Sequence, residues 1–192
     1  PYVDYVFSGP ALVSFPAFIE HVRNGHPNGC DQIDGVFSVN NDHGTSVELL
    51  GKDLDIDTSL PLDYEPFLDA FEQNVNGPTT KPFLLFETSR GCWWADRTGC
   101  TFCGLNGMTP CYRAMRPEDA IRQINAVLHH AARAPYSVAV DTVVPGNYFT
   151  DVFPYITPPP GASMKYETRP ALSEQQLKVL CDAGVRAIQP GI

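Results

Sequence analysis

The sequence has no apolar run long enough to cross a lipid bilayer, because no stretch approaches the roughly 18 consecutive apolar residues that a membrane helix needs. It also lacks the pattern of a secretory signal, which is a basic segment followed by an apolar one near the N-terminus. We therefore expect a soluble, cytoplasmic protein with no membrane partner.

Positive charge is scarce as well. The chain has 13 lysines and arginines against 22 aspartates and glutamates, which gives a formal net charge of -9 and a pI of about 4.8. A chain of this charge has no long-range field that attracts nucleic acid, and it is poorly suited to an electrostatic membrane anchor. We expect no nucleic-acid partner, while a basic substrate segment would be tolerated.

The composition excludes a disordered chain, because 43% of the residues are apolar, 11% are aromatic and only 18% are charged. A length of 192 residues is enough for one ordinary domain or for parts of two. The chain begins at Pro1 and stops inside the apolar run 185–192. We interpret both ends as cuts and expect a fragment of a longer protein.

The first 39 residues predict a small α/β piece. Residues 2–7 and 33–39 have the composition of buried strands, and 11–22 have the apolar spacing of a helix. A strand, a helix and a strand in this order are typical of the edge of a parallel sheet. Residues 40–80 are polar and predict a linker with a short helix around 66–71. Its spaced aspartates resemble a calcium loop, but the required glycine and terminal glutamate are missing.

From residue 81 onward the pattern becomes a regular alternation of strands and helices. We predict strands over 82–87, 137–144, 164–168 and 185–192, and helices over 117–134 and from Ser173 to Gly184. The second helix opens with a capping box formed by Ser173 and Gln176. Such alternation implies a parallel sheet or a (β/α) barrel, of which four strands would be about half.

Three of the six cysteines crowd into twelve residues, and without a secretory signal this favours metal ligation over disulfide bonds. Cys92, Cys100 and Cys103 follow the strand 82–87 directly, at the end where barrel enzymes build their sites. Three thiolates can hold three irons of a [4Fe-4S] cluster and leave the fourth iron open for S-adenosylmethionine. The competing interpretation is a structural zinc site with Cys111 as the fourth ligand.

The residues around these cysteines carry a family resemblance. The spacing Cys-x7-Cys-x2-Cys resembles that of the radical S-adenosylmethionine (SAM) superfamily, in which Cys-x3-Cys-x2-Cys is commoner. The flanking residues extend the likeness, with Ser89-Arg90-Gly91 before Cys92, Trp93-Trp94 after it, and Gly104-Leu105-Asn106-Gly107 after Cys103. This longer motif is similar to the cobalamin-binding-domain radical SAM enzymes that mature ribosomally made peptides (RiPPs), often as C-methyltransferases.

The resemblance implies an α/β architecture in three parts. Residues 1–39 would be the tail of a Rossmann-like cobalamin-binding domain, 40–80 a linker, and 81–192 the first half of a radical SAM (β/α) partial TIM barrel. Two departures are visible. The Asp-x-His-x-x-Gly signature of some cobalamin-binding relatives is absent, since Asp42-His43-Gly44 does not reproduce it, and the segment around Cys111 is shifted from the family pattern.

The resemblance also implies cofactors, partners and site residues. The cofactors are a [4Fe-4S] cluster on Cys92, Cys100 and Cys103, S-adenosylmethionine, and cobalamin in the full-length enzyme. The partners are a peptide substrate and a flavodoxin-like or ferredoxin-like electron donor. Phe102 is expected to pack on the adenine, and Glu167 and Gln189 to bind the ribose or the amino group.

Each of these roles has a structural alternative, and the function itself has competing interpretations. An aromatic residue such as Phe102 can equally fill the core of its own loop, and Glu167 and Gln189 can be solvated strand ends. No catalytic residue is assigned from the sequence. The outcome could also be ring formation or methylation of a small metabolite, and a non-enzymatic zinc-stabilised binding module is the competing class. Cys181 follows Leu177 at helical spacing, which predicts that its side chain is buried.

Overall fold

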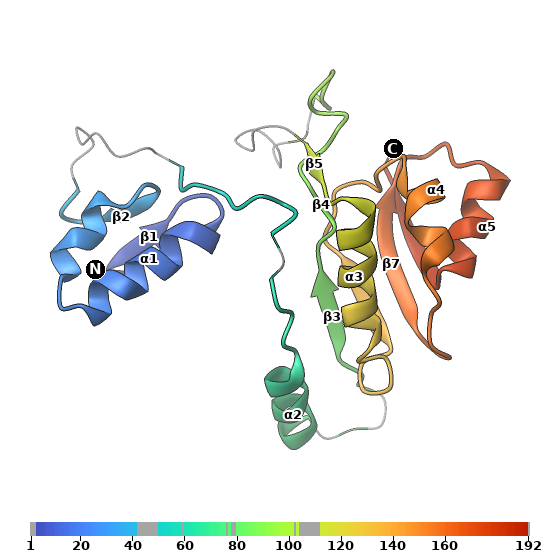
Figure 1. Cartoon of the computed structure of the whole chain (residues 1–192), viewed down its shortest axis with the longest axis horizontal. Coiled ribbons are helices and arrows are strands. Elements are labelled where there is room, and N and C mark those ends of the chain that lie inside the picture. Colours follow the sequence, from blue (N-terminus) through green and yellow to red (C-terminus); the bar gives the residue numbers. More distant parts are fainter. Residues whose placement is uncertain are drawn as a thin grey trace. The chain divides into compact units, whose positions relative to one another are not determined.

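The computed structural model describes residues 3–41, 50–58, 60–75, 77, 80–101, 103 and 112–191. The chain is a mixed α/β protein that divides into two compact units, Pro1–Asp55 and Ile56–Ile192 (Figure 1). The predicted linker over 40–80 is thus shared between the two units. None of the helices in the described parts of the chain combines the length and apolar character needed to cross a membrane.

The first unit is a two-stranded sheet covered by one helix. Strands β1 (Tyr5–Phe7) and β2 (Val36–Ser38) pair with each other, and helix α1 (Ala11–Arg23) packs on them. The contact is aromatic, since the ring of Phe18 meets the rings of Tyr5 and Phe7 with centroid distances of 4.8 and 5.3 Å. Rings in these edge-to-face geometries stabilise a core that would otherwise be small.

The pairing of β1 with β2 is antiparallel, so the predicted parallel edge in this region is wrong. The reason is the 3-10 helix η1 (Pro27–Gln32), which carries the chain back along α1 before β2 begins. The Cys30 thiol lies 3.9 Å from the carbonyl oxygen of Phe18, in the middle of α1. The chain then turns at Gly35, whose φ of 74° is left-handed, and enters β2 beside the end of β1.

The second unit is built on a parallel sheet of four strands in the order β3-β6-β7-β8. These strands are β3 (Phe83–Phe86), β6 (Tyr136–Ala139), β7 (Ser163–Thr168) and β8 (Val185–Pro190). Each predicted strand in this half is therefore present, and neighbours in sequence are neighbours in the sheet. The strand β6 is shorter than its predicted range, because from Val140 onward the chain leaves the sheet to form a loop.

Helices cover one face of this sheet (Figure 1). The helices α3 (Pro117–Leu128), α4 (Tyr148–Asp151) and α5 (Glu174–Asp182) and the 3-10 helix η2 (Phe153–Tyr155) supply one buried cluster with every second residue of the strands. Side chains that alternate with these point to the other face, where Phe83, Leu85 and Tyr136 are each about half exposed. One face of the sheet is therefore buried under the helices, and the other face is open.

Two predictions about the helices need correction. The helix α3 ends at Leu128 and is followed by turns, whereas the prediction extended it to Ala134. Cys181 is exposed on α5, although its spacing from Leu177 predicted burial. The buried residue of α5 is Leu180, and Leu177 itself is 40% exposed, so the two residues share the outer side of the helix.

The helix α2 (Glu65–Asn74) belongs to the second unit and matches the short helix predicted in the linker. It is held by Arg133, whose guanidinium contacts the carboxylates of Glu65, Asp69 and Glu72 at 2.5, 2.7 and 2.8 Å. These residues are three or four positions apart, so they lie on one side of α2 and converge on a single cation.

Candidate functional site

The cysteine segment is a loop whose two ends are tied together. After β3 the chain forms β4 (Ser89–Arg90), which pairs antiparallel with β5 (Arg113–Ala114). The segment between these short strands holds Cys92, Cys100 and Cys103. The loop follows the carboxyl end of β3 (Figure 1), which is where parallel α/β proteins assemble their binding sites.

The three cysteines are available for ligation but are not gathered around one point. Cys100 and Cys103 are exposed, Cys92 is partly buried, and all three thiols are free. A turn joins Cys103 N to the Cys100 carbonyl oxygen at 3.2 Å. Among the described residues no group of three or more His, Cys, Asp or Glu side chains could hold a metal ion. Phe102 and Cys111 lie outside the described residues.

The donor set fits an iron–sulfur cluster in its chemistry. Soft thiolates on one accessible loop are the ligands that such clusters use. The one acidic side chain between Cys92 and Cys100 is Asp96, and its carboxylate accepts a hydrogen bond from Tyr112 N at 2.7 Å. The loop must close further before its three sulfurs can share a cluster.

Glu167 and Gln189 are brought together by the sheet. They are register partners on β7 and β8, near the carboxyl ends of these strands. The Nζ atom of Lys165 donates a hydrogen bond to Gln189 Oε1 at 3.0 Å, so a cation stands beside the pair. Glu167 alternates along β7 with the buried Tyr166 and Thr168 and therefore points to the open face. The structure pairs these two predicted site residues but does not bring them to the cavity described below.

A buried carboxylate that the sequence did not single out anchors the entrance of the cysteine loop. Asp141, 1% exposed, follows β6 and accepts hydrogen bonds from Thr88 N at 2.7 Å, Thr88 Oγ1 at 2.5 Å and Ser89 Oγ at 3.0 Å. Burial raises the pKa of Asp141 from 3.8 to about 6, and the hydrogen bonds from Thr88 and Ser89 lower it only in part. The only sequence signal was an acidic residue inside the predicted strand 137–144.

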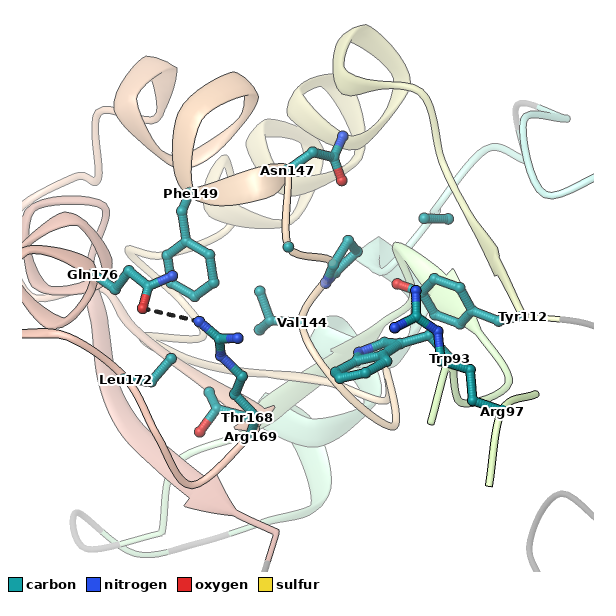
Figure 2. A pocket seen from close by; sticks show the side chains of 13 residues that line it. Trp93, Arg97, Tyr112, Val144, Asn147, Phe149, Thr168, Arg169, Leu172 and Gln176 are labelled. Carbon is teal, nitrogen blue, oxygen red and sulfur yellow. Dashed lines mark hydrogen bonds between the residues drawn. The ribbon is translucent and has the colours of Figure 1, made fainter. Parts of the chain in front are cut away.

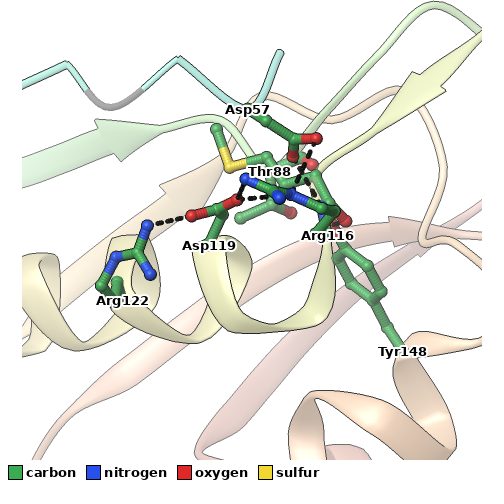
Figure 3. Close-up of polar contacts among 7 residues, drawn as sticks. Asp57, Thr88, Arg116, Asp119, Arg122 and Tyr148 are labelled. Atoms are coloured by element: carbon green, nitrogen blue, oxygen red, sulfur yellow. Dashed lines mark hydrogen bonds and ion pairs between the residues drawn. The ribbon is translucent and has the colours of Figure 1, made fainter.

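The exit of the loop is fixed by a second polar cluster (Figure 3). The hydroxyl of Tyr148 lies 2.9 Å from the carbonyl oxygen of Thr88 and 3.0 Å from that of Met115, so it joins the two ends of the loop. Arg116 contacts Asp57 at 3.1 Å and Asp119 at 2.8 Å, and Asp119 also pairs with Arg122. Both ends of the cysteine loop are thus anchored to the rigid core.

A cavity of about 450 Å³ opens beside the loop (Figure 2). Its walls come from the cysteine loop, from the loop 144–149 after β6, and from the segment 168–176 after β7. Trp93 and Arg97 contribute from the cysteine loop, and the Arg97 guanidinium lies 5.7 Å from the centre of the Trp93 ring, a cation–π distance. The size is within the range of about 300–1,000 Å³ that is typical of small-ligand sites.

The raised pKa of Asp141 predicts a specific dependence of stability on pH. Below pH 3.8 the carboxyl is protonated in both the folded and the unfolded chain. As the pH rises toward 6, the unfolded chain ionises while the folded chain keeps its proton, so the free energy of unfolding falls. The pKa difference corresponds to about 3 kcal/mol. We expect this loss between pH 4 and pH 6 in urea titrations, and its absence in Asp141→Asn; equal pH profiles would contradict it.

No protein-family model, curated protein or solved structure matches this chain. The functional assignment therefore rests on the residues of the chain and on their arrangement.

Proposed function

We propose that this chain is part of a radical SAM enzyme and that Cys92, Cys100 and Cys103 hold its [4Fe-4S] cluster. The observation that carries the proposal is the placement of three free thiols on one anchored loop at the carboxyl end of a parallel strand. When bound, such a cluster supplies the electron that cleaves S-adenosylmethionine to an adenosyl radical.

The residues around the loop have defined tasks under this proposal. Asp141 and Tyr148 hold its two ends in place, so that the thiols can close on a cluster without reorganising the sheet. Trp93 lies in the cavity wall beside the loop, where an aromatic ring limits the access of water. Glu167 and Gln189, paired on the open face, are the proposed contacts for polar groups of S-adenosylmethionine.

The finer parts of the proposal follow from the family resemblance. The four-stranded sheet would be the first half of a (β/α) barrel, and its open face would then line the barrel interior. The first unit would be the tail of a cobalamin-binding domain. The reaction would be cobalamin-dependent C-methylation of a ribosomally made peptide, with a flavodoxin-like or ferredoxin-like protein as the electron donor.

Anaerobic reconstitution tests the proposal directly. We expect about four irons and four sulfides per chain, and an electron paramagnetic resonance signal of the reduced cluster that changes when S-adenosylmethionine is added, because the fourth iron has no protein ligand. Zinc without sulfide would establish the zinc module instead. A cluster whose signal ignores S-adenosylmethionine would show that all four irons are already ligated and would overturn the radical function.

A further inference from the structure

The cavity beside the cysteine loop carries a charge opposite to that of the chain. Its described lining includes two guanidinium groups, Arg97 and Arg169, and no carboxylate, although the chain as a whole has a net charge of -9. Figure 2 shows the two arginines on either side of Val144 in this view. Within the described chain neither guanidinium is neutralised by an ion pair, unlike Arg116, Arg122 and Arg133.

The other walls are suited to an organic ligand rather than to a free ion. The rings of Trp93 and Phe149 and the side chains of Val144 and Leu172 supply apolar surface. Thr168 adds a hydroxyl that is 2% exposed and has no hydrogen-bond partner among the described residues. The oxygen of this hydroxyl has almost no accessible surface, so the ligand contacts at this wall come from the apolar side chains.

The start of α5 favours a carboxylate over a phosphate as the ligand of this cavity. Phosphates commonly bind to free N–H groups at the start of a helix. Here the start of α5 is closed by a capping box, because Gln176 N donates to Ser173 Oγ and Ser173 N donates to Gln176 Oε1. Gln176 Oε1 also lies 3.4 Å from the Arg169 guanidinium, on the cavity side. A planar guanidinium can pair with two oxygens of either a carboxylate or a phosphate, so the closed start of α5 is the feature that favours the carboxylate.

We propose that this cavity binds an acidic side chain of the peptide substrate, with its carboxylate at Arg169 and a neighbouring apolar side chain against Trp93 and Phe149. The inference rests on the proposed peptide-modifying function and adds a recognition element to it. The overall negative charge opposes it weakly, because at physiological salt the repulsion from distant carboxylates is screened beyond about 8 Å.

Binding can be measured on the metal-free, full 192-residue chain, whose two tryptophans, Trp93 and Trp94, both lie in the cysteine loop. The probe is an acetylated hexapeptide with one glutamate beside one phenylalanine. Its binding is measured by the quenching of the protein's tryptophan fluorescence. We expect the same peptide with glutamine to bind roughly tenfold more weakly, and Arg169→Glu to abolish the difference between the two peptides. Arg169→Lys should keep part of it, because charge remains but the fork is lost.

The matched control is Lys81→Glu, which reverses the charge of an exposed residue in the same way. Lys81 precedes β3, whereas the cysteine loop follows that strand. It should leave the preference for glutamate unchanged. Equal binding of the two peptides, equal effects of Lys81→Glu and Arg169→Glu, or displacement of the peptide by inorganic phosphate at lower concentration than by acetate would each overturn the inference. Because no metal is present, failure here leaves the cluster proposal intact, and failure of reconstitution leaves this measurement interpretable.

Discussion

Replacing any one of Cys92, Cys100 and Cys103 with serine should remove the iron and the labile sulfide from the reconstituted protein. A cluster that leaves one iron for S-adenosylmethionine has three protein ligands, so the loss of one thiolate leaves two irons without a protein donor. A serine hydroxyl is a poor substitute for a soft thiolate. The measurement is the iron and sulfide content after anaerobic reconstitution, together with the visible absorption of the cluster.

Two other cysteines provide the controls. Cys181 is an exposed free thiol on α5, away from the cysteine loop, and Cys181→Ser should keep the full iron content. Cys111→Ser separates the two metal interpretations, because a cluster on three cysteines survives it whereas a zinc site with four cysteine ligands loses its metal. If Cys111→Ser were as deficient as Cys100→Ser, the open iron site and the radical chemistry that depends on it would have to be abandoned.

The sequence predicted the parts of the fold that have local causes. The four strands of the second unit are present because each apolar run is bounded by turns, and α5 begins where the capping box of Ser173 and Gln176 predicts it. The position of the cysteine loop after β3 was predicted in the same way, because the loop begins where the apolar run of that strand ends. The antiparallel pairing of β1 and β2 could not be predicted, because it depends on the return of η1 along α1, a tertiary contact without a periodic signal.

The misplacement of Cys181 and the omission of Asp141 also have physical causes. Spacing alone gives the relative angle of two helical residues but not which side of the helix faces the core. Leu177 and Cys181 both lie on the outer side of α5, whose buried residue is Leu180. Asp141 lies within the predicted strand 137–144, and acidic side chains are usually solvated. Asp141 is buried because its partners Thr88 and Ser89, more than 50 residues earlier, supply three donors to its carboxylate.

Removing the Asp141 carboxylate should loosen the base of the cysteine loop. In Asp141→Ala the N–H and hydroxyl of Thr88 and the hydroxyl of Ser89 lose their acceptor inside the protein, where both residues are at most 1% exposed. Stranded donors of this kind cost about 1–3 kcal/mol each, and the relief of a buried charge offsets part of the sum at neutral pH. We expect the free energy of unfolding to fall by about 2 kcal/mol at pH 7, measured by urea denaturation.

The pH and the matched variants decide whether this loss has the proposed cause. The deficit of Asp141→Ala should widen at pH 5, because the wild-type carboxyl regains its proton below its pKa of about 6 while the alanine variant has nothing to protonate. Asp141→Asn keeps an acceptor for Thr88 N and should lose much less, and Asp151→Ala removes an exposed carboxylate on α4 as the control. The thiol of Cys92, partly buried in the folded loop, should react faster with a thiol reagent in Asp141→Ala alone. An unchanged reaction rate beside a lowered stability would mean that Asp141 supports the core but does not position the loop.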